Sequence, residues 1–190
     1  MPLPPSDVAR EPLHTRTVKV NSFVREDGLW DLEAELIDLK AYSFQKQGGV
    51  THPVGAPIHH MHLRITIDAE FTITDAVAVY DAAPYGENCA CIADDYKKLV
   101  GLNLLRKFRD AVRARFARTA GCTHMTELSY VLPTVAIQTM ANRRRQDAEP
   151  QNQQKRPFQL EGCHALRLTG PVVKTFYPVW YVDPQGSGSE

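Results

Sequence analysis

Apolar and polar residues alternate along much of the first half of the chain, and this period of two predicts β-strands. The strands are expected at about residues 14–25, 29–42, 58–68 and 71–80. Glu26-Asp27-Gly28 is typical of a hairpin turn, because glycine readily adopts a positive φ. The polar segment 45–57 is expected to link the second strand to the third. Consecutive antiparallel strands of this kind form a meander.

The third predicted strand carries histidines on both faces. Its polar face consists of His60, His62, Arg64, Thr66 and Asp68. His59 instead has the parity of the apolar residues, so it is expected to point toward the core. Residues two apart on a strand face the same way, so His60 and His62 suit either a metal-binding pair or the wall of a substrate pocket.

The apolar spacing lengthens after Asp94 toward the 3.6-residue period of a helix. The stripe of the first predicted helix consists of Leu105, Phe108, Val112 and Phe116. Gly121 is expected to end that helix, since glycine is favoured just past a C-terminus. A second helix is expected from Thr123, its cap, to about Ala141, with Pro133 kinking or splitting it.

The sequence after about residue 141 indicates less regular structure. Segment 142–157 is polar and is expected to be a mobile loop, whereas 164–168 and 172–177 are expected to be short strands. With residues 1–11 as a disordered leader and 183–190 as a tail, the chain is expected to form a single domain over 12–182. The fold class is α+β: an antiparallel meander of about four strands, plus short C-terminal strands, packed against two or three helices.

Composition narrows the range of partners. The 190 residues are 43% hydrophobic, and Lys plus Arg equals Asp plus Glu at 22 each. This balance argues against a general nucleic-acid or membrane-surface partner. No apolar run approaches the roughly 20 residues that span a bilayer, and no secretory signal is recognisable, so a cytoplasmic protein with reduced cysteines is expected. Because an open meander leaves exposed edges, a homodimer is also expected.

Cysteine and histidine recur in two short motifs, Gly121-Cys122-Thr123-His124 and Cys163-His164. A thiolate is favoured at a helix N-terminus, where His124 could act as its base; the alternative is that Cys122 is simply a small buried side chain. Residues of the type that bind zinc are His59, Cys122, His124, Cys163 and His164. Their spacing matches no common zinc motif.

Other charged and aromatic residues have two interpretations each. Arg25 and Asp27 flank the first turn and suit a local ion pair better than a substrate contact. Glu127 either complements the helix dipole or, in a pocket with histidine, acts as a general acid or base. Tyr85, like Tyr42 and Tyr80, is a candidate proton donor or stacking group. No nucleotide-binding fingerprint is present, so no nucleotide cofactor is expected.

An ordered set of motifs resembles the bacterial domain-of-unknown-function family 2889 over about residues 12–180. The motifs are Arg25-x-Asp27-Gly28-Leu29-Trp30-Asp31, Ile58-His59-x-Met61-x-x-Arg64-x-Thr66, Pro84-Tyr85, Gly121-Cys122-Thr123-His124 and Cys163-His164-Ala165. The resemblance implies that the family retains His59, Arg64, Cys122, His124, Glu127 and His164. It also implies Asp and an aromatic residue where this chain has His60 and His62, and a context of aromatic or acyl-compound degradation in catabolic bacteria.

The first hypothesis is therefore a cytosolic acid–base enzyme without cofactor or assigned metal. We expect a lyase that acts on an aromatic or hydroxylated compound by elimination or by retro-aldol loss of a small aldehyde. His59 or His124 would be the base, Arg64 would hold negative charge, and Glu127 or a tyrosine would return the proton. Substrate contacts are expected from His60, His62, Arg25 and Tyr85. The alternatives are a non-catalytic metal- or ligand-binding module that uses the Cys/His set, and a regulatory domain that binds a partner through the arginine-rich first helix.

Overall fold

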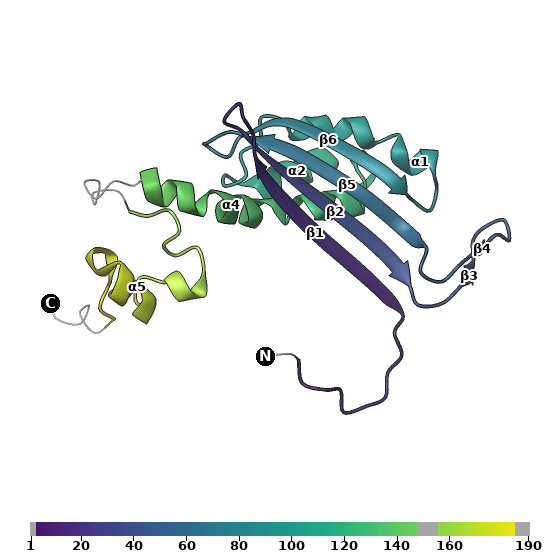
Figure 1. Cartoon of the computed structure of the whole chain (residues 1–190), viewed down its shortest axis with the longest axis horizontal. Coiled ribbons are helices and arrows are strands. Elements are labelled where there is room, and N and C mark those ends of the chain that lie inside the picture. Colours follow the sequence, from purple (N-terminus) through teal and green to yellow (C-terminus); the bar gives the residue numbers. More distant parts are fainter. Residues whose placement is uncertain (1–2, 148–155, 185–190) are drawn as a thin grey trace. The chain divides into compact units, whose positions relative to one another are not determined.

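A four-stranded antiparallel sheet organises the computed structural model, which describes residues 3–147 and 156–184 (Figure 1). Its strands are β1 (His14–Val24), β2 (Trp30–Lys40), β5 (Pro57–Ile67) and β6 (Ile73–Ala82), in the spatial order β1-β2-β5-β6. The predicted α+β meander is confirmed, and the expected strand bounds agree to within a few residues. The linker between β2 and β5 holds a small hairpin of β3 (Phe44–Gln45) and β4 (Thr51–His52).

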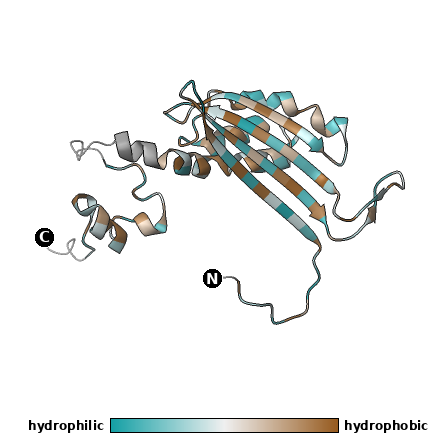
Figure 2. Cartoon of the chain, in the orientation of Figure 1, coloured by the Kyte–Doolittle hydropathy of each residue, from teal (hydrophilic) through white to brown (hydrophobic). Residues whose placement is uncertain are grey.

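The sheet has one covered and one open face, as the alternation predicts. Apolar and polar bands follow one another along the strands in Figure 2. The apolar residues at alternate positions of β2 and β5 are almost fully buried, including Leu32, Leu36, Leu63 and Ile65. Burying an aliphatic side chain of this size contributes about 1.5–3 kcal/mol, so this face supplies much of the folding free energy.

Short helices cover the apolar face. In chain order they are α1 (Glu87–Ala90), the 3₁₀ helix η1 (Ala93–Leu99), α2 (Phe108–Phe116), the 3₁₀ helix η2 (Arg118–Ala120), α3 (Thr123–Ser129) and α4 (Leu132–Asp147). Their core residues include Tyr96, Phe108, Val112, Met125 and Leu132. The predicted split of the second helix is confirmed, because α3 and α4 are separate helices, but the break lies at residues 130–131 and Pro133 is the second residue of α4. The first predicted helix is shorter than expected: Leu105 precedes α2 and is 37% exposed.

The chain divides into two compact units, Met1–Ala141 and Asn142–Glu190. The sequence instead predicts one domain over 12–182. The second unit contains the 3₁₀ helix η3 (His164–Leu166), α5 (Pro171–Phe176) and the 3₁₀ helix η4 (Pro178–Trp180). The prediction of strands at 164–168 and 172–177 is therefore wrong. Pro171 follows Gly170 and takes the first position of α5, where a fixed φ and a missing N–H favour a helix.

The expected mobile loop at 142–157 is also partly wrong, because residues 142–147 continue α4. Residues 148–155 lie outside the described part of the chain, as do residues 185–190 of the expected tail. Across the described ranges, no helix combines the length and the apolar character needed to cross a bilayer.

Candidate functional site

A buried carboxylate lies at the centre of the most concentrated group of titratable residues. Asp38 occupies the covered face of β2 and its side chain is 3% exposed. Its Oδ1 accepts hydrogen bonds from Arg16 Nε at 2.8 Å and His14 Nε2 at 3.0 Å. Its Oδ2 accepts from Arg16 Nη2 at 2.8 Å and His59 Nδ1 at 2.9 Å. Four charge-assisted or polar donors therefore offset the cost of burying this carboxylate.

The strand register brings these residues together. Arg16 of β1 is paired with Asp38 of β2, and Asp38 is paired with His59 of β5. The three residues thus form a row across three neighbouring strands, on the helix-covered face and beyond the end of the apolar core. His59 points to this face, as its parity predicts.

His124 completes the group from the helical layer. Its ring centroid lies 3.8 Å from that of His59, with an angle of 30° between the ring planes. Its Nε2 is 3.9 Å from Asp38 Oδ2. The two candidates for the general base, His59 and His124, are therefore neighbours although 65 positions separate them in the sequence.

Two local features fix where His124 lies. The hydroxyl of buried Tyr96 accepts a hydrogen bond from Cys122 N at 3.0 Å and lies 2.9 Å from Cys122 O, which holds the start of α3. Gly121 passes so close to α2 that an added Cβ would lie 2.7 Å from Phe116 Cβ. A glycine is thus required immediately before the Cys122–His124 turn.

The electrostatics of the group favour an ionised carboxylate and neutral imidazoles. Burial raises the pKa of Asp38, but the hydrogen bonds and charges of Arg16 and His59 outweigh it and bring this pKa to about 2. Burial lowers the pKa of His59, and Asp38 only partly offsets this. Burial, and then the charges of His59 and Arg16, lower the pKa of His124. Both histidines are therefore mostly uncharged at neutral pH.

Glu127 joins the group through one arginine. Arg16 Nη1 donates to Glu127 Oε2 at 2.8 Å, while the rest of the guanidinium binds Asp38. The Glu127 side chain is 54% exposed, so it lies at the solvent edge of the site. Glu127 is thus close enough to serve the site, although its catalytic role stays a prediction.

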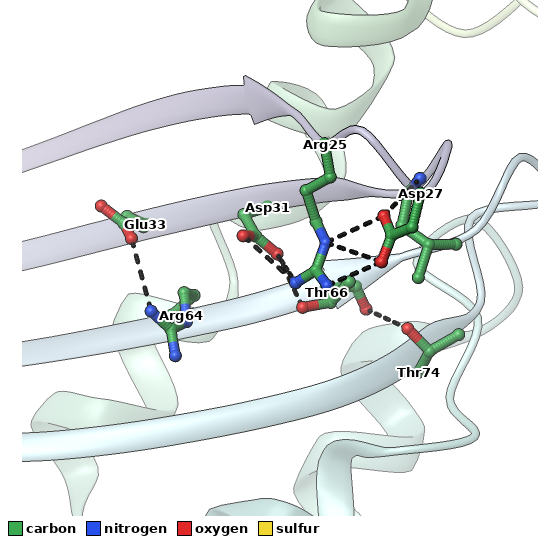
Figure 3. Close-up of polar contacts among 8 residues, drawn as sticks. Arg25, Asp27, Asp31, Glu33, Arg64, Thr66 and Thr74 are labelled. Carbon is green, nitrogen blue, oxygen red and sulfur yellow. Dashed lines mark hydrogen bonds and ion pairs between the residues drawn. The ribbon is translucent and has the colours of Figure 1, made fainter.

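Arg64 lies on the other side of the sheet, and grouping it with His59 is wrong. Arg64 Nη1 is 3.8 Å from Glu33 Oε1 on the open face (Figure 3). Its strand parity differs from that of His59, so the sheet itself separates the two side chains.

Arg25 takes the local role favoured by the sequence. Its guanidinium binds Asp27 at 2.7 Å and lies 3.4 Å from Asp31, beside the β1–β2 turn (Figure 3). Asp31 also accepts a hydrogen bond from Thr66 Oγ1 at 2.7 Å. This network is at the opposite end of the strands from Asp38, so the expected substrate contact of Arg25 has no support from its position.

His60 and His62 form a second polar group on the open face, with carboxylates from the neighbouring strands. His60 Nε2 is 2.9 Å from Glu35 Oε1, and His62 Nε2 is 2.9 Å from Asp81 Oδ2. Tyr85 follows β6 and is 64% exposed. The roles of His60, His62 and Tyr85 in substrate binding stay predictions.

The Cys/His set divides between the two units. Cys163 and His164 belong to the second unit, where His164 contacts Arg167 at 3.0 Å. Two groups in the described residues have donor atoms within 4.8 Å of one another: Asp38-His59-His124 and Glu35-His60-His62. Neither group includes a cysteine. Cys122, and not the expected Thr123, is the N-cap residue of α3.

Comparison with known proteins identifies the family. DUF2889, described as a protein of unknown function, matches residues 14–138. The chain belongs to this family. The matched range is shorter than the predicted 12–180, so it contains the whole Asp38 group but not Cys163-His164. No curated protein and no solved structure matches the chain.

Three residues of the site were not singled out from the sequence: His14, Arg16 and Asp38. A usable signal was present, because each has the parity of the apolar face of its strand. Polar side chains at apolar positions, at the same end of neighbouring strands, indicate a buried polar site rather than a solvated surface.

Proposed function

We propose that this member of DUF2889 is a small-molecule enzyme that performs acid–base catalysis at the Asp38 site. The observation that carries the proposal is the 2.9 Å contact between His59 Nδ1 and Asp38 Oδ2. An ionised carboxylate only accepts hydrogen bonds, so Nδ1 of His59 holds the proton. Its Nε2 is then unprotonated, which is the tautomer of a general base.

The neighbouring residues support this role for His59. Arg16 keeps Asp38 ionised, and the lowered pKa of His59 keeps the imidazole unprotonated at neutral pH. His124, whose ring centroid lies 3.8 Å from that of His59, would donate a hydrogen bond to developing negative charge, the role that the sequence assigned to Arg64. Glu127 at the solvent edge would relay to the product the proton that His59 takes up.

A lyase reaction uses these groups without a nucleotide cofactor. In a retro-aldol cleavage, His59 Nε2 removes the proton of a hydroxyl group β to a carbonyl group. The carbon–carbon bond then breaks, a small aldehyde leaves, and the electron pair of that bond forms an enolate. The His59 imidazolium, which holds the proton taken from the hydroxyl group, then protonates the enolate, which gives the second product and restores the base. We propose aromatic or hydroxylated substrates in a catabolic, cytoplasmic setting.

Turnover of a panel of aryl β-hydroxy ketones, followed by release of aldehyde, tests the proposal. His59→Gln should lower kcat/KM by about 10²–10⁴-fold, the usual contribution of a general base. Glu33→Gln is the control, because Glu33 lies on the neighbouring strand β2 but on the open face, where it contacts only Arg64 among the charged residues described. Wild-type activity in His59→Gln, or equal losses in both variants, would contradict the assignment.

The pH profile supplies a second readout. Because the pKa of His59 lies below its ordinary 6.5, kcat/KM should rise with pH below that value and be level at neutral pH. Asp38→Asn removes the charge that raises the pKa of His59, so the acid limb should move to lower pH. An unchanged limb would show that His59 is not the titrating base.

A non-catalytic metal- or ligand-binding module is the second candidate. It is favoured by the donor atoms of Asp38, His59 and His124, which lie within 4.8 Å of one another. A cation there would have to displace donors from Asp38 and approach the Arg16 guanidinium, so we rank it below acid–base catalysis. Zn²⁺ binding that depends on His59 and His124, with no turnover of the panel, would favour the module.

We also propose a homodimer. Strand β1 forms one edge of the sheet, and its apolar residues Phe23 and Val24 are 48% and 70% exposed. Pairing of this edge with a second copy would satisfy its backbone and cover these side chains. Light scattering of the full chain should give twice the monomer mass; the monomer mass at all concentrations would contradict this.

A further inference from the structure

The open face of the sheet carries a group of four potential metal ligands that the Asp38 site does not use. They come from three neighbouring strands: Glu35 from β2, His60 and His62 from β5, and Asp81 from β6. Glu35 and His62 are direct partners in the β2–β5 register. Asp81 lies at the irregularity in the β5–β6 pairing, between the partners of His60 and Met61. The ordered frame of the sheet, and not a loop, therefore holds all four residues.

The side chains converge on one another. His60 Nε2 lies 2.9 Å from Glu35 Oε1, and His60 Nδ1 lies 3.7 Å from Asp81 Oδ2. His62 Nε2 lies 2.9 Å from the same Asp81 Oδ2, and the two imidazole centroids are 4.6 Å apart. One donor atom each from Glu35, His60 and His62 lies within 4.8 Å of the others. Small side-chain rotations would bring such atoms to the spacing of ligands around a single ion.

The chemistry of the group matches a divalent transition metal. Two imidazoles and two carboxylates are ligands that zinc and its neighbours accept, whereas Mg²⁺ and Ca²⁺ prefer oxygen alone. The two carboxylates carry a charge of −2, which balances the charge of the ion. The side chains are between 25% and 52% exposed, so an ion can enter from solvent.

The Asp38 group and the open-face group differ in whether an arginine, which would repel a bound cation, contacts their carboxylates. Arg16 occupies both carboxylate oxygens of Asp38. On the open face, the nearest arginine in the strand, Arg64, is turned to Glu33 at 3.8 Å. Of the two groups, the one on the open face therefore offers carboxylates that no guanidinium among the described residues binds.

We propose that Glu35, His60, His62 and Asp81 form a binding site for a divalent transition-metal ion such as Zn²⁺, separate from the acid–base site on the covered face. A hollow of about 490 Å³ adjoins it and is lined by Glu35, His62, Arg64 and Val79, among others. Water or a small anionic group can thus reach the ion from the side of the hollow.

Zinc titration of the full chain tests the site. Tag-free protein is stripped of metal with a chelator, and the Kd for Zn²⁺ is measured by competition with a chromophoric chelator at neutral pH. Loss of groups that only support a metal ligand weakens binding 10–100-fold, so His60→Gln/His62→Gln, which removes two ligands, should raise the Kd by about 100-fold or more. Glu35→Gln should raise it by about tenfold or more.

The matched control removes the two histidines of the covered face. His59→Gln/His124→Gln should leave one Zn²⁺ bound with a Kd within about threefold of wild type, since the two groups lie on opposite faces of the sheet and share no side-chain partner. Line broadening of the His60 and His62 ring signals by Co²⁺, seen by NMR in the wild-type chain, locates the ion without any substitution.

Each outcome decides the matter. Zinc binding lost in His60→Gln/His62→Gln, together with Co²⁺ broadening of His60 and His62, supports the site. Absence of zinc binding in the wild type overturns it, as does a Kd unchanged in this double variant. Binding lost in His59→Gln/His124→Gln but kept in His60→Gln/His62→Gln would also overturn it, and would place the metal at Asp38. Aldehyde release in the absence of zinc binding would leave the proposed enzyme standing and remove only this site.

Discussion

Replacing Asp38 with asparagine should strongly destabilise the first unit. The pKa of Asp38 is about 2, against an ordinary 3.8, and at 1.36 kcal/mol per pH unit this difference corresponds to about 2.5 kcal/mol of stability at neutral pH. Breaking a buried ion pair by removing one partner costs about 3–5 kcal/mol. Asparagine keeps the shape but presents its amide to the Arg16 guanidinium, so we expect a loss of about 3 kcal/mol.

The dependence on pH makes this prediction specific. A carboxyl group whose pKa is lowered by folding stabilises the protein above the pKa of the unfolded chain, and this contribution disappears as pH falls through the folded value. The difference in stability between wild type and Asp38→Asn should therefore be full at pH 7 and shrink between about pH 4 and pH 2. A constant difference across this range would mean that packing, and not charge, explains the loss.

Urea unfolding followed by far-UV circular dichroism measures the free energy of unfolding of both proteins. Glu35→Gln is the matched control, because its carboxylate also contacts a histidine but is 32% exposed. A partly exposed pair of this kind contributes about 0–1 kcal/mol. If the free energy of unfolding of Asp38→Asn is within about 0.5 kcal/mol of the wild-type value at pH 7, the charge of the buried carboxylate does not stabilise the fold.

Three further predictions concern the same site. Folding lowers the pKa of His59 and His124, so the unfolded chain binds more protons than the folded one below about pH 6.5. The urea concentration at the unfolding midpoint should therefore be lower at pH 5 than at pH 6.5, and this difference should be smaller in His59→Gln/His124→Gln. Tyr96→Phe removes the hydroxyl that holds Cys122 and should cost about 1–3 kcal/mol in urea unfolding; a neutral effect would contradict that role. Gly121→Ala should cost about 1–3 kcal/mol by overpacking against α2 and should change the His124 ring signals in NMR; unchanged stability and signals would show that the approach relaxes freely.

The sequence was most informative where a single physical pattern was strong. Alternation over eleven residues of β5 placed His59 on the covered face and His60 and His62 on the open face, because a strand gives each residue one of two directions. Alternation could not show that Asp38 lies beside His59, since pairing of β2 with β5 depends on a register that spans the β3–β4 hairpin. The partner of His59 therefore emerged only from the fold.

The failures at the C-terminus have a different cause. Segments as short as 164–168 and 172–177 do not distinguish a period of two from one helical turn, so β-branched residues such as Val172 and Val173 suggested strands. Gly170-Pro171, a local signal for a helix start, was the more reliable indicator. The grouping of Arg64 with His59 failed for a simpler reason: it ignored a difference in parity that the alternation already contained.

The adjacency of His59 and His60 in one strand limits how this chain can change length. A deletion of one residue within the strand would exchange its two faces, carrying His60 toward Asp38 and His59 into solvent. The hairpin between β2 and β5 has no such restriction, because added residues there lengthen a surface loop and leave the register intact. Insertions and deletions among related chains should therefore be confined to the hairpin, whereas the spacing from His59 to the end of β5 should be the same in all of them.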